Sequence, residues 1–240
     1  MEYGLQMWSV RDASEKSLSE ALKKVAEIGY KYIEFAGFFN HPAEEVKAIL
    51  DEYGLIVSGT HSGLGDLDND FAGTVKYHKT IGNTNYILPG APWDTKEALD
   101  STIAKLNKYK PMLEAEGITL GYHNHDGEFK PNKDGIIAHE EMEKRTTVNF
   151  EIDTYWAFVA GRDPIETITR LKDRVKIIHL KDGTRDRHGK ALGEGEAPVK
   201  AVREKAIELG MRMVVESEGL QPTGLEEVAR CMTFLRSLEK

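Results

Sequence analysis

Short apolar runs alternate with longer segments of helical spacing along the whole chain. The short runs are rich in Ile, Val, Leu and Tyr and are bounded by turn residues, a pattern typical of buried parallel strands. The longer segments carry apolar residues three and four positions apart, as in 18–26, which predicts amphipathic helices. Eight apolar runs predict eight strands, at 3–9, 32–36, 55–60, 86–89, 118–123, 148–153, 175–180 and 212–216.

The segments between these runs carry the signals of helix ends. Ser17 and Glu20 fit a capping box, and Asp163 followed by Pro164 marks another helix start. Glycines, which can take the left-handed conformation that ends a helix, precede several of the predicted strands. These glycines are Gly29, Gly54, Gly82, Gly117 and Gly210.

The helix, glycine and strand pattern repeats about every 30 residues, as expected for a (β/α)8 barrel of this length. Right-handed crossovers between parallel strands would close the repeat into that barrel, the TIM barrel fold of the α/β class. An open doubly wound sheet is the competing fold, but no G-x-G-x-x-G motif follows the first predicted strand. No linker-like or low-complexity stretch interrupts 1–240, so the sequence predicts a single domain.

The composition narrows the choice of partners. Hydrophobic residues make up 40% and charged residues 30% of the chain, as in ordinary soluble globular proteins. The formal net charge of -8 argues against nucleic acid as the main partner, because duplex-binding proteins usually carry a basic face. The single cysteine, Cys231, excludes a disulfide within the chain and a cysteine-based metal site.

The cellular compartment and the oligomeric state are indicated only by weaker features of the sequence. No apolar run approaches the roughly 20 residues that span a bilayer, so we expect no membrane partner. Residues 1–4 lack a basic segment followed by an apolar one, the mark of a secretion signal. The sequence therefore predicts a cytoplasmic protein. Barrels of this type often pair, which leaves a homo-oligomer open, although the sequence marks no interface.

Polar and charged residues gather at the ends of the predicted strands, where the chemistry of such barrels is found. Strand residues two positions apart share a face, so the two residues of each of three pairs are expected to lie on the same face at the mouth. These pairs are Glu151 with Asp153, His179 with Lys181, and Glu216 with Glu218. The other strand-end residues are Glu34, His61, His123, Asn124 and His125, followed by Asp126 and Glu128.

Carboxylates inside a barrel lose their hydration and need compensation, and one divalent cation is the simplest source. Carboxylates with imidazole suit Mn²⁺, Mg²⁺, Co²⁺ or Zn²⁺, and without thiolates the set does not choose among them. The expected ligands are Asp153, His179 and Glu216, with a fourth from the fifth strand segment. Glu128 is favoured by charge and His123 by position. The alternative for these residues is a buried hydrogen-bond network without metal.

The sequence resembles the xylose-isomerase-like barrel superfamily, and within it the sugar phosphate isomerase/epimerase group. That group includes ketose 3-epimerases and inosose dehydratases. The resemblance covers nearly the whole chain, and its most specific segments are YHNHDGEF at 122–129, IHLKD at 178–182, LGEGE at 192–196 and VESE at 215–218.

The resemblance implies metal binding through Glu, Asp, His and Glu from the fifth to the eighth strand. The last three correspond to Asp153, His179 and Glu216. Two positions depart from the pattern of the epimerases, which often have Glu where this chain has His123 and His where it has Trp156. In those epimerases the first and last Glu transfer the protons, so the change at His123 argues against plain 3-epimerisation.

Other residues at the predicted mouth have expected roles in catalysis and binding. Glu216 or His123 would act as the base, since histidine titrates near neutral pH, and Lys181 would orient the substrate or act as an electrophile. Trp8 and Trp156 would either stack on a sugar ring or pack at the rim of the barrel. Arg185, with Arg187 and Lys190, forms either a solvated basic loop or an anion site. The remaining expected substrate-binding residues are His61, His125, Glu151 and Glu218.

These features predict a divalent-metal-dependent isomerase or epimerase that acts on a sugar, ketose or keto-polyol through an enediolate. The alternative is a metal-dependent lyase on the same site, either an inosose-type dehydratase or a keto-glycoside lyase. Two further readings rank lower. One is a phosphodiesterase like the AP endonucleases, such as DNA endonuclease IV, a distant relative within the superfamily. The other is a non-catalytic sugar-binding barrel.

Overall fold

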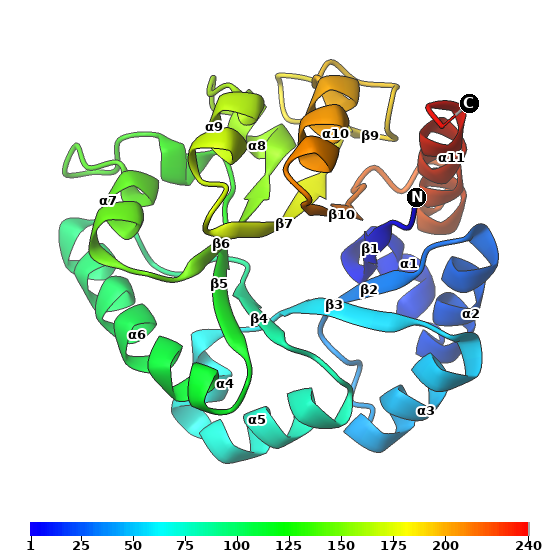
Figure 1. Ribbon diagram of the computed structural model, residues 1–240, viewed down its shortest axis with the longest axis horizontal. Coiled ribbons are helices and arrows are strands. Elements are labelled where there is room, and N and C mark those ends of the chain that lie inside the picture. Colours follow the sequence, from blue (N-terminus) through cyan, green and yellow to red (C-terminus); the bar gives the residue numbers. More distant parts are fainter. Residues whose placement is uncertain (240) are drawn as a thin grey trace.

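The computed structural model describes residues 1–239. Eight parallel strands follow one another around a closed barrel, and the last pairs with the first (Figure 1). This confirms the predicted (β/α)8 barrel. The strands are β1 (Gly4–Gln6), β2 (Tyr32–Ala36), β3 (Ile56–His61), β4 (Asn85–Leu88), β5 (Thr119–His123), β6 (Asn149–Asp153), β7 (Val175–Leu180) and β10 (Arg212–Val215).

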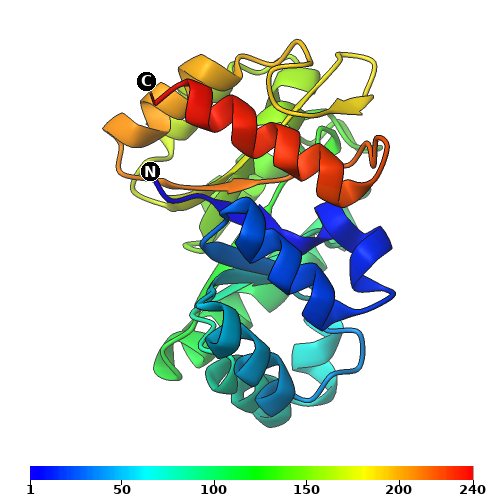
Figure 2. The same ribbon diagram turned by 90° about the vertical axis from the view of Figure 1, so that its right-hand side faces the viewer.

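Helices surround the barrel (Figure 1). Helix α11 packs beside α1 and α2, where the two ends of the chain meet (Figure 2). In the described part of the chain, no helix has both the length and the apolar character needed to cross a bilayer. The helices are α1 (Arg11–Ser14), α2 (Leu18–Ile28), α3 (Ala43–Tyr53), α4 (Leu64–Asn69), α5 (Phe71–Thr80), α6 (Lys96–Ala115), α7 (Ala138–Arg145), α8 (Thr154–Val159), α9 (Pro164–Arg170), α10 (Val199–Glu208) and α11 (Gly224–Ser237), with short 3₁₀ helices η1 (Met7–Val10) and η2 (Gly127–Phe129).

The predicted helix ends are present. The Ser17 hydroxyl accepts a hydrogen bond from the Glu20 amide at 3.3 Å, and Asp163 caps α9 with Pro164 at its first turn. The five glycines predicted before strands all have positive φ, between 64° and 110°. Glycine adopts this left-handed conformation without the steric cost that a Cβ would bring. Local sequence therefore sets where these helices stop.

Two segments differ from the predicted pattern. The first strand, predicted over 3–9, ends at Gln6 because the Gln6 side chain accepts a hydrogen bond from the Trp8 amide and the chain turns into η1. After β7 the chain forms a small antiparallel hairpin of β8 (Asp182–Gly183) and β9 (Gly189–Lys190). Strands of two residues are too short to give a periodic pattern.

The apolar core lies mainly between the strands and the surrounding helices, and the barrel interior near its mouth is polar. Residues such as Phe35, Leu120 and Val215 are fully or almost fully buried. Inside the barrel, a Cβ on Gly59 would lie 3.1 Å from Glu34 Oε2 and 2.8 Å from Ile87 Cδ1. Glycine at 59 therefore leaves room for a carboxylate in the interior.

Candidate metal centre and active site

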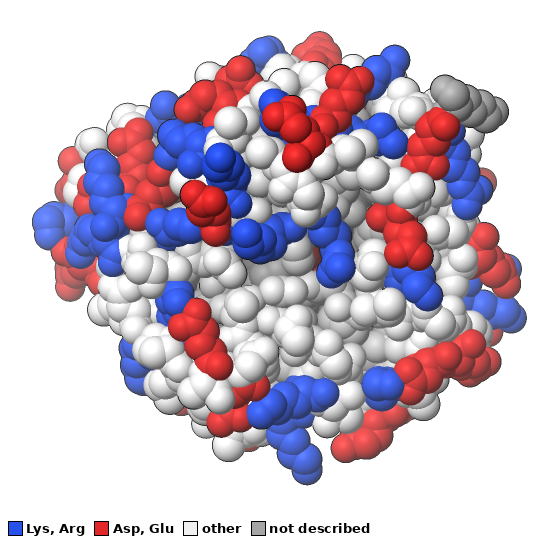
Figure 3. Space-filling view, viewed as in Figure 1, with Lys and Arg blue, Asp and Glu red and all other residues white. Residues whose placement is uncertain are grey.

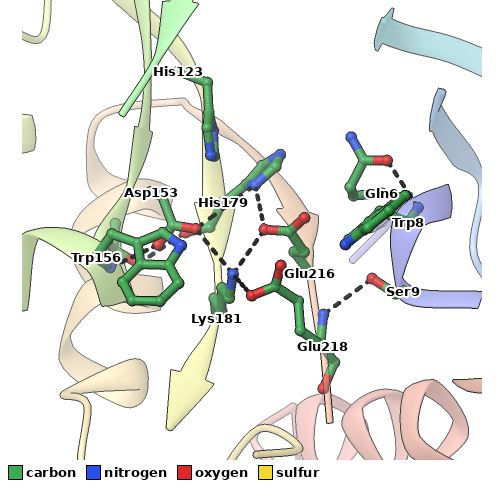
Figure 4. Close-up of polar contacts among 12 residues, drawn as sticks. Gln6, Trp8, Ser9, His123, Asp153, Trp156, His179, Lys181, Glu216 and Glu218 are labelled. Carbon is green, nitrogen blue, oxygen red and sulfur yellow. Dashed lines mark hydrogen bonds and ion pairs between the residues drawn. The ribbon is translucent and has the colours of Figure 1, made fainter. Parts of the chain in front are cut away.

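Four side chains converge where β5, β6, β7 and β10 end. His123 and Asp153 end their strands, His179 lies one residue before the end of β7, and Glu216 follows β10 directly. Each offers one ligand atom, and these atoms all lie within 4.8 Å of one another. All four residues are buried, with at most 5% exposure. Figure 4 shows them arranged around a common centre.

The imidazole of His179 has a distinct partner on each side. Its Nδ1 lies 3.2 Å from Glu216 Oε2 and 3.9 Å from Asp153 Oδ2. Its Nε2 lies 2.7 Å from Glu34 Oε1. An ionised carboxylate only accepts hydrogen bonds, so Nε2–H donates to Glu34. This leaves Nδ1 facing the cluster, and a carboxylate behind the imidazole is a common way to orient a metal-binding histidine.

A second layer shares His123 and His179 with this cluster and adds Glu151 of β6 and His61 at the end of β3. The ligand atoms of His61, His123, Glu151 and His179 also lie within 4.8 Å of one another. Two of its imidazoles already have carboxylate partners: His61 Nε2 lies 2.8 Å from Glu151 Oε2, and His179 Nε2 lies 2.7 Å from Glu34 Oε1. Below them, Gln6 Nε2 donates to Glu34 Oε1 at 2.7 Å. We therefore take this layer as support for the upper cluster, which is the better candidate for metal binding.

The upper cluster fits a divalent ion. Among the described residues, Asp153 Oδ2 and His123 Nδ1 are buried without a hydrogen-bond partner. Leaving such an atom unpaired in the interior costs about 1–3 kcal/mol. A cation held by two carboxylates and two imidazoles would compensate for unpaired ligand atoms in this cluster, and the donor set suits Mn²⁺, Co²⁺ or Zn²⁺, with Mg²⁺ less favoured by imidazole.

Lys181 supplies a positive charge beside the cluster. Its fully buried ammonium lies 3.0 Å from Glu216 Oε2 and 3.7 Å from Asp153 Oδ2, and it also donates to Glu218. Burial alone would lower the pKa of Lys181, but the carboxylates around it outweigh burial and raise that pKa. Lys181 therefore stays protonated and can donate hydrogen bonds to a bound oxygen.

The buried acids respond differently to their neighbours. Burial raises the pKa of Asp153 to about 6, although Lys181 acts against it. Burial also acts to raise the pKa of Glu216, but Lys181 and His179 hold it well below the usual value. Burial and the nearby Glu34 together raise the pKa of Glu151. The site therefore contains more carboxylate groups than its cationic side chains, Lys181 and His179, can neutralise.

Glu128 does not join either group of ligand atoms. The η2 turn directs its buried side chain back toward β5, where Oε1 accepts from the Tyr122 hydroxyl and Oε2 from the His125 amide, both at 3.1 Å. Of the two fourth ligands left open by the sequence, the structure brings His123 into the cluster and leaves Glu128 outside it.

A pocket of about 360 Å³ opens above the cluster. Trp8, predicted to stack on a sugar ring, is 45% exposed at its rim, with the Arg11 guanidinium 4.8 Å from its ring centroid. Sequence reasoning missed Ala36 and Pro89, whose small or rigid side chains carry no chemical signal. The lining residues are Trp8, Ala36, His61, Pro89, His123, His125, Glu216 and Glu218.

The basic loop after β7 is only partly directed toward this region. The Arg185 side chain lies over the Phe158 ring and donates to the Phe158 carbonyl oxygen, so the structure does not bring it into the pocket. Arg187 lies 3.2 Å from Asp126 Oδ1 and near the Trp156 ring. On the face seen in Figure 3, acidic and basic side chains are interspersed around a central hollow.

The sequence and the fold of this chain are similar to those of known proteins. Residues 22–238 match the xylose isomerase-like TIM barrel family. The inosose dehydratase of Geobacillus kaustophilus is 24% identical over 192 residues, which cover 70% of this chain but only 62% of that enzyme. The 2-oxo-tetronate isomerase of Haemophilus influenzae is 25% identical over 89% of this chain and 93% of its own.

A solved structure of a sugar phosphate isomerase/epimerase from Parabacteroides distasonis superposes with a TM-score of 0.84. It is 23% identical, and the match covers 98% of this chain and 95% of that one, which shows a shared fold. The family match extends over most of the chain, including every strand that contributes to the cluster. The protein is therefore a member of the xylose isomerase-like TIM barrel family, which contains sugar-modifying enzymes such as epimerases and inosose dehydratases.

Proposed function

We propose that this protein is a divalent-metal-dependent isomerase or epimerase for a sugar, ketose or keto-polyol. The observation that carries the proposal is the convergence of His123, Asp153, His179 and Glu216 beneath an open pocket. When bound there, a divalent ion supplies Lewis-acid polarisation of a substrate carbonyl. The acidic proton on the neighbouring carbon then becomes easier to remove, which gives an enediolate.

The chain's own residues supply the proton transfers. Glu216 lines the pocket and is kept ionised by Lys181 and His179, so it can accept the proton. His125 also lines the pocket, and burial lowers its pKa, which keeps the imidazole neutral and able to exchange a proton. The Lys181 ammonium can hold a substrate oxygen by donating a hydrogen bond. Return of the proton to the opposite face would give the epimer.

A lyase outcome on the same site is the second candidate. His123 stands where a second carboxylate base would complete a two-base epimerisation. With His123 among the metal ligands, Glu216 is the one carboxylate in the cluster that also lines the pocket. Elimination needs one base and one acid, and the protonated Lys181 could donate a proton to a leaving hydroxyl. The likeness to an inosose dehydratase supports this candidate.

The test begins with metal content. Protein stripped with a chelator and reloaded with Mn²⁺, Mg²⁺, Co²⁺ or Zn²⁺ is expected to retain one ion per chain. Asp153→Asn and His179→Gln are expected to lose it, whereas Glu204→Gln, on the exposed surface of α10, is expected to keep it. A protein that retains no ion under any of these conditions contradicts the proposal.

The reaction is read by NMR after incubation with ketoses and an inosose in D₂O. Deuterium at the carbon beside the carbonyl together with an epimeric or isomeric product supports the isomerase. Loss of water without return of the proton supports the lyase. Binding of a sugar with neither outcome supports a non-catalytic barrel.

A further inference from the structure

Trp156 holds an unpaired hydrogen-bond donor beside the candidate metal centre. It lies in the first turn of α8, three residues after Asp153, and its backbone amide donates to Asp153 Oδ1 at 2.9 Å. The same carboxylate group therefore offers one oxygen to the cluster and fixes the start of the helix with the other. The indole is thus tied by its backbone to a candidate metal ligand.

The faces of the indole are largely occupied. The ring is only 8% exposed. The Lys181 ammonium lies 4.8 Å from its ring centroid, the Arg187 guanidinium 5.4 Å, and the Tyr155 ring 4.9 Å. These contacts leave little of the ring free to stack on a sugar, the role expected from the sequence. They hold the side chain rigidly and favour a role for its edge.

That edge carries Nε1, which is buried and has no hydrogen-bond partner among the described residues. Figure 4 shows the nitrogen-bearing edge turned toward Asp153, His179 and Lys181. A buried indole nitrogen normally finds an acceptor, because leaving a donor unpaired costs about 1–3 kcal/mol. Indole N–H can only donate, so the missing partner is an acceptor.

We propose that Trp156 is a specificity-determining residue whose Nε1–H donates a hydrogen bond to an oxygen of the substrate, next to the carbon that reacts. This inference rests on the proposed function, because it needs a polyol or ketose that extends from the pocket past His125, which lines the pocket and whose ring centroid lies 5.9 Å from that of Trp156. It assigns Trp156 recognition of one hydroxyl or carbonyl oxygen from the edge of the ring. A substrate analogue lacking that oxygen would leave the buried donor unpaired and would be rejected.

The direct measurement is the ¹⁵N–¹H NMR signal of the indole. The chain has three tryptophans, so Trp8→Phe, Trp93→Phe and Trp156→Phe assign the signals by elimination. Metal-loaded protein is titrated with an inosose and, as a minimal polyol, with glycerol. The Trp156 signal is expected to move and its proton to exchange more slowly with solvent. Trp93, whose ring lies against Gly127 of η2, is the control.

Kinetics supply a second readout. Trp156→Phe keeps an aromatic ring but removes the N–H, and it is expected to raise KM about 5- to 50-fold, as for loss of one buried hydrogen bond. Trp156→His, which restores a ring N–H, is expected to recover part of the loss. A merely structural role would not produce this recovery.

The outcomes separate the inference from the proposed function. If the protein turns over a ketose or inosose while the Trp156 signal stays still and Trp156→Phe matches the wild type, only the inference is overturned. If the metal is absent but the Trp156 signal still responds to glycerol, the proposed function fails and donation to a polyol stands. If neither probe moves the Trp156 signal more than that of Trp93, the inference is wrong.

Discussion

At the scale of single residues, burial has opposite consequences for different carboxylates. The Asp153 carboxyl lies among other acids, and burial raises its pKa to about 6. Burial also acts to raise the pKa of Glu143, but His139 and Arg170 outweigh it and lower that pKa to about 2. Glu143 Oε1 lies 2.7 Å from His139 Nδ1 and accepts from Arg170 Nη2 at 3.0 Å. The first acid is suited to a cation, and the second already has its partners.

Glu143→Gln is expected to lower the free energy of unfolding by about 1–2 kcal/mol at pH 7, a figure reduced for partial exposure of the pair. Because the folded pKa lies below the unfolded value of 4.5, the contribution is fully present well above pH 4.5. It is lost as the pH falls toward about 2. Urea denaturation across this range measures it.

The control for this change is Glu166→Gln, an acid of the same region that is 62% exposed and is expected to alter stability little. If the two variants are equally stable at pH 7, Glu143 does not contribute as described.

The sequence predicted which residues lie near the candidate site better than it predicted the direction in which their side chains point. Asp153, His179 and Glu216 could be chosen because each stands at the end of an apolar run. The turn of Glu128 away from the cluster depends on the 3₁₀ geometry of η2, which leaves no periodic pattern. The contact of Gln6 could not be predicted for a similar reason. Gln6 is a polar residue within an apolar run, and the sequence does not indicate that its side chain contacts Glu34 of the neighbouring strand.

At the scale of elements, one carboxylate organises the loop between β7 and α10. Asp182 accepts hydrogen bonds from the amides of Gly183, Gly193, Gly195 and Ala197. Four donors from one loop fix its path over the barrel mouth. The helix ends were predicted from glycines and capping residues, but this loop was not, because its order comes from contacts between residues up to 15 positions apart.

Gly195→Ala is expected to loosen this loop. An added Cβ would lie 2.2 Å from Asp182 Oδ1 and 2.5 Å from the Gly183 amide nitrogen, so the hydrogen bonds to Asp182 would be disrupted. Trypsin should then cleave after Arg185 or Arg187 several times faster than in the wild type, as followed by mass spectrometry.

Gly189→Ala provides the matched control in the same loop. Its added Cβ would have no atom closer than 3.7 Å, an ordinary contact distance. Equal cleavage rates for the two alanine variants would contradict the role given to Asp182.

At the scale of the whole molecule, side chains from both ends of the chain close the barrel. Arg203 Nε donates to the Tyr3 hydroxyl at 2.7 Å, and that hydroxyl donates to Glu239 Oε1 at 3.1 Å. Tyr3 and Arg203 are both buried, at 1% and 8% exposure. These contacts support the pairing of β1 with β10.

Tyr3→Phe is expected to lower the free energy of unfolding by about 1–3 kcal/mol, because it leaves the Nε of the buried Arg203 without its acceptor. The matched change Tyr32→Phe removes a hydroxyl that contacts Glu2 at an exposed position and should have little effect. Chemical denaturation distinguishes the two, and similar losses for both would argue against a special role for the closure.

Metal binding is expected to stabilise the whole barrel. An ion at a concentration 100 times its Kd adds about 2.7 kcal/mol, which for a chain of this size corresponds to a rise of about 5–10 °C in Tm. Calorimetry with and without chelator measures the shift. Asp153→Asn should show almost none, and a full shift in that variant would place the ion elsewhere.

The two-sided contacts of His179 also bear on how the protein could be divided. All four candidate ligands come from the second half of the chain, whereas Gln6 and Glu34, which hold the far side of the imidazole, come from the first quarter. A fragment beginning near β5 would carry every ligand and yet hold His179 loosely. Adding the missing half as a separate peptide should lower the Kd of the ion for the fragment. The assembly of the two pieces could therefore be followed through metal affinity alone.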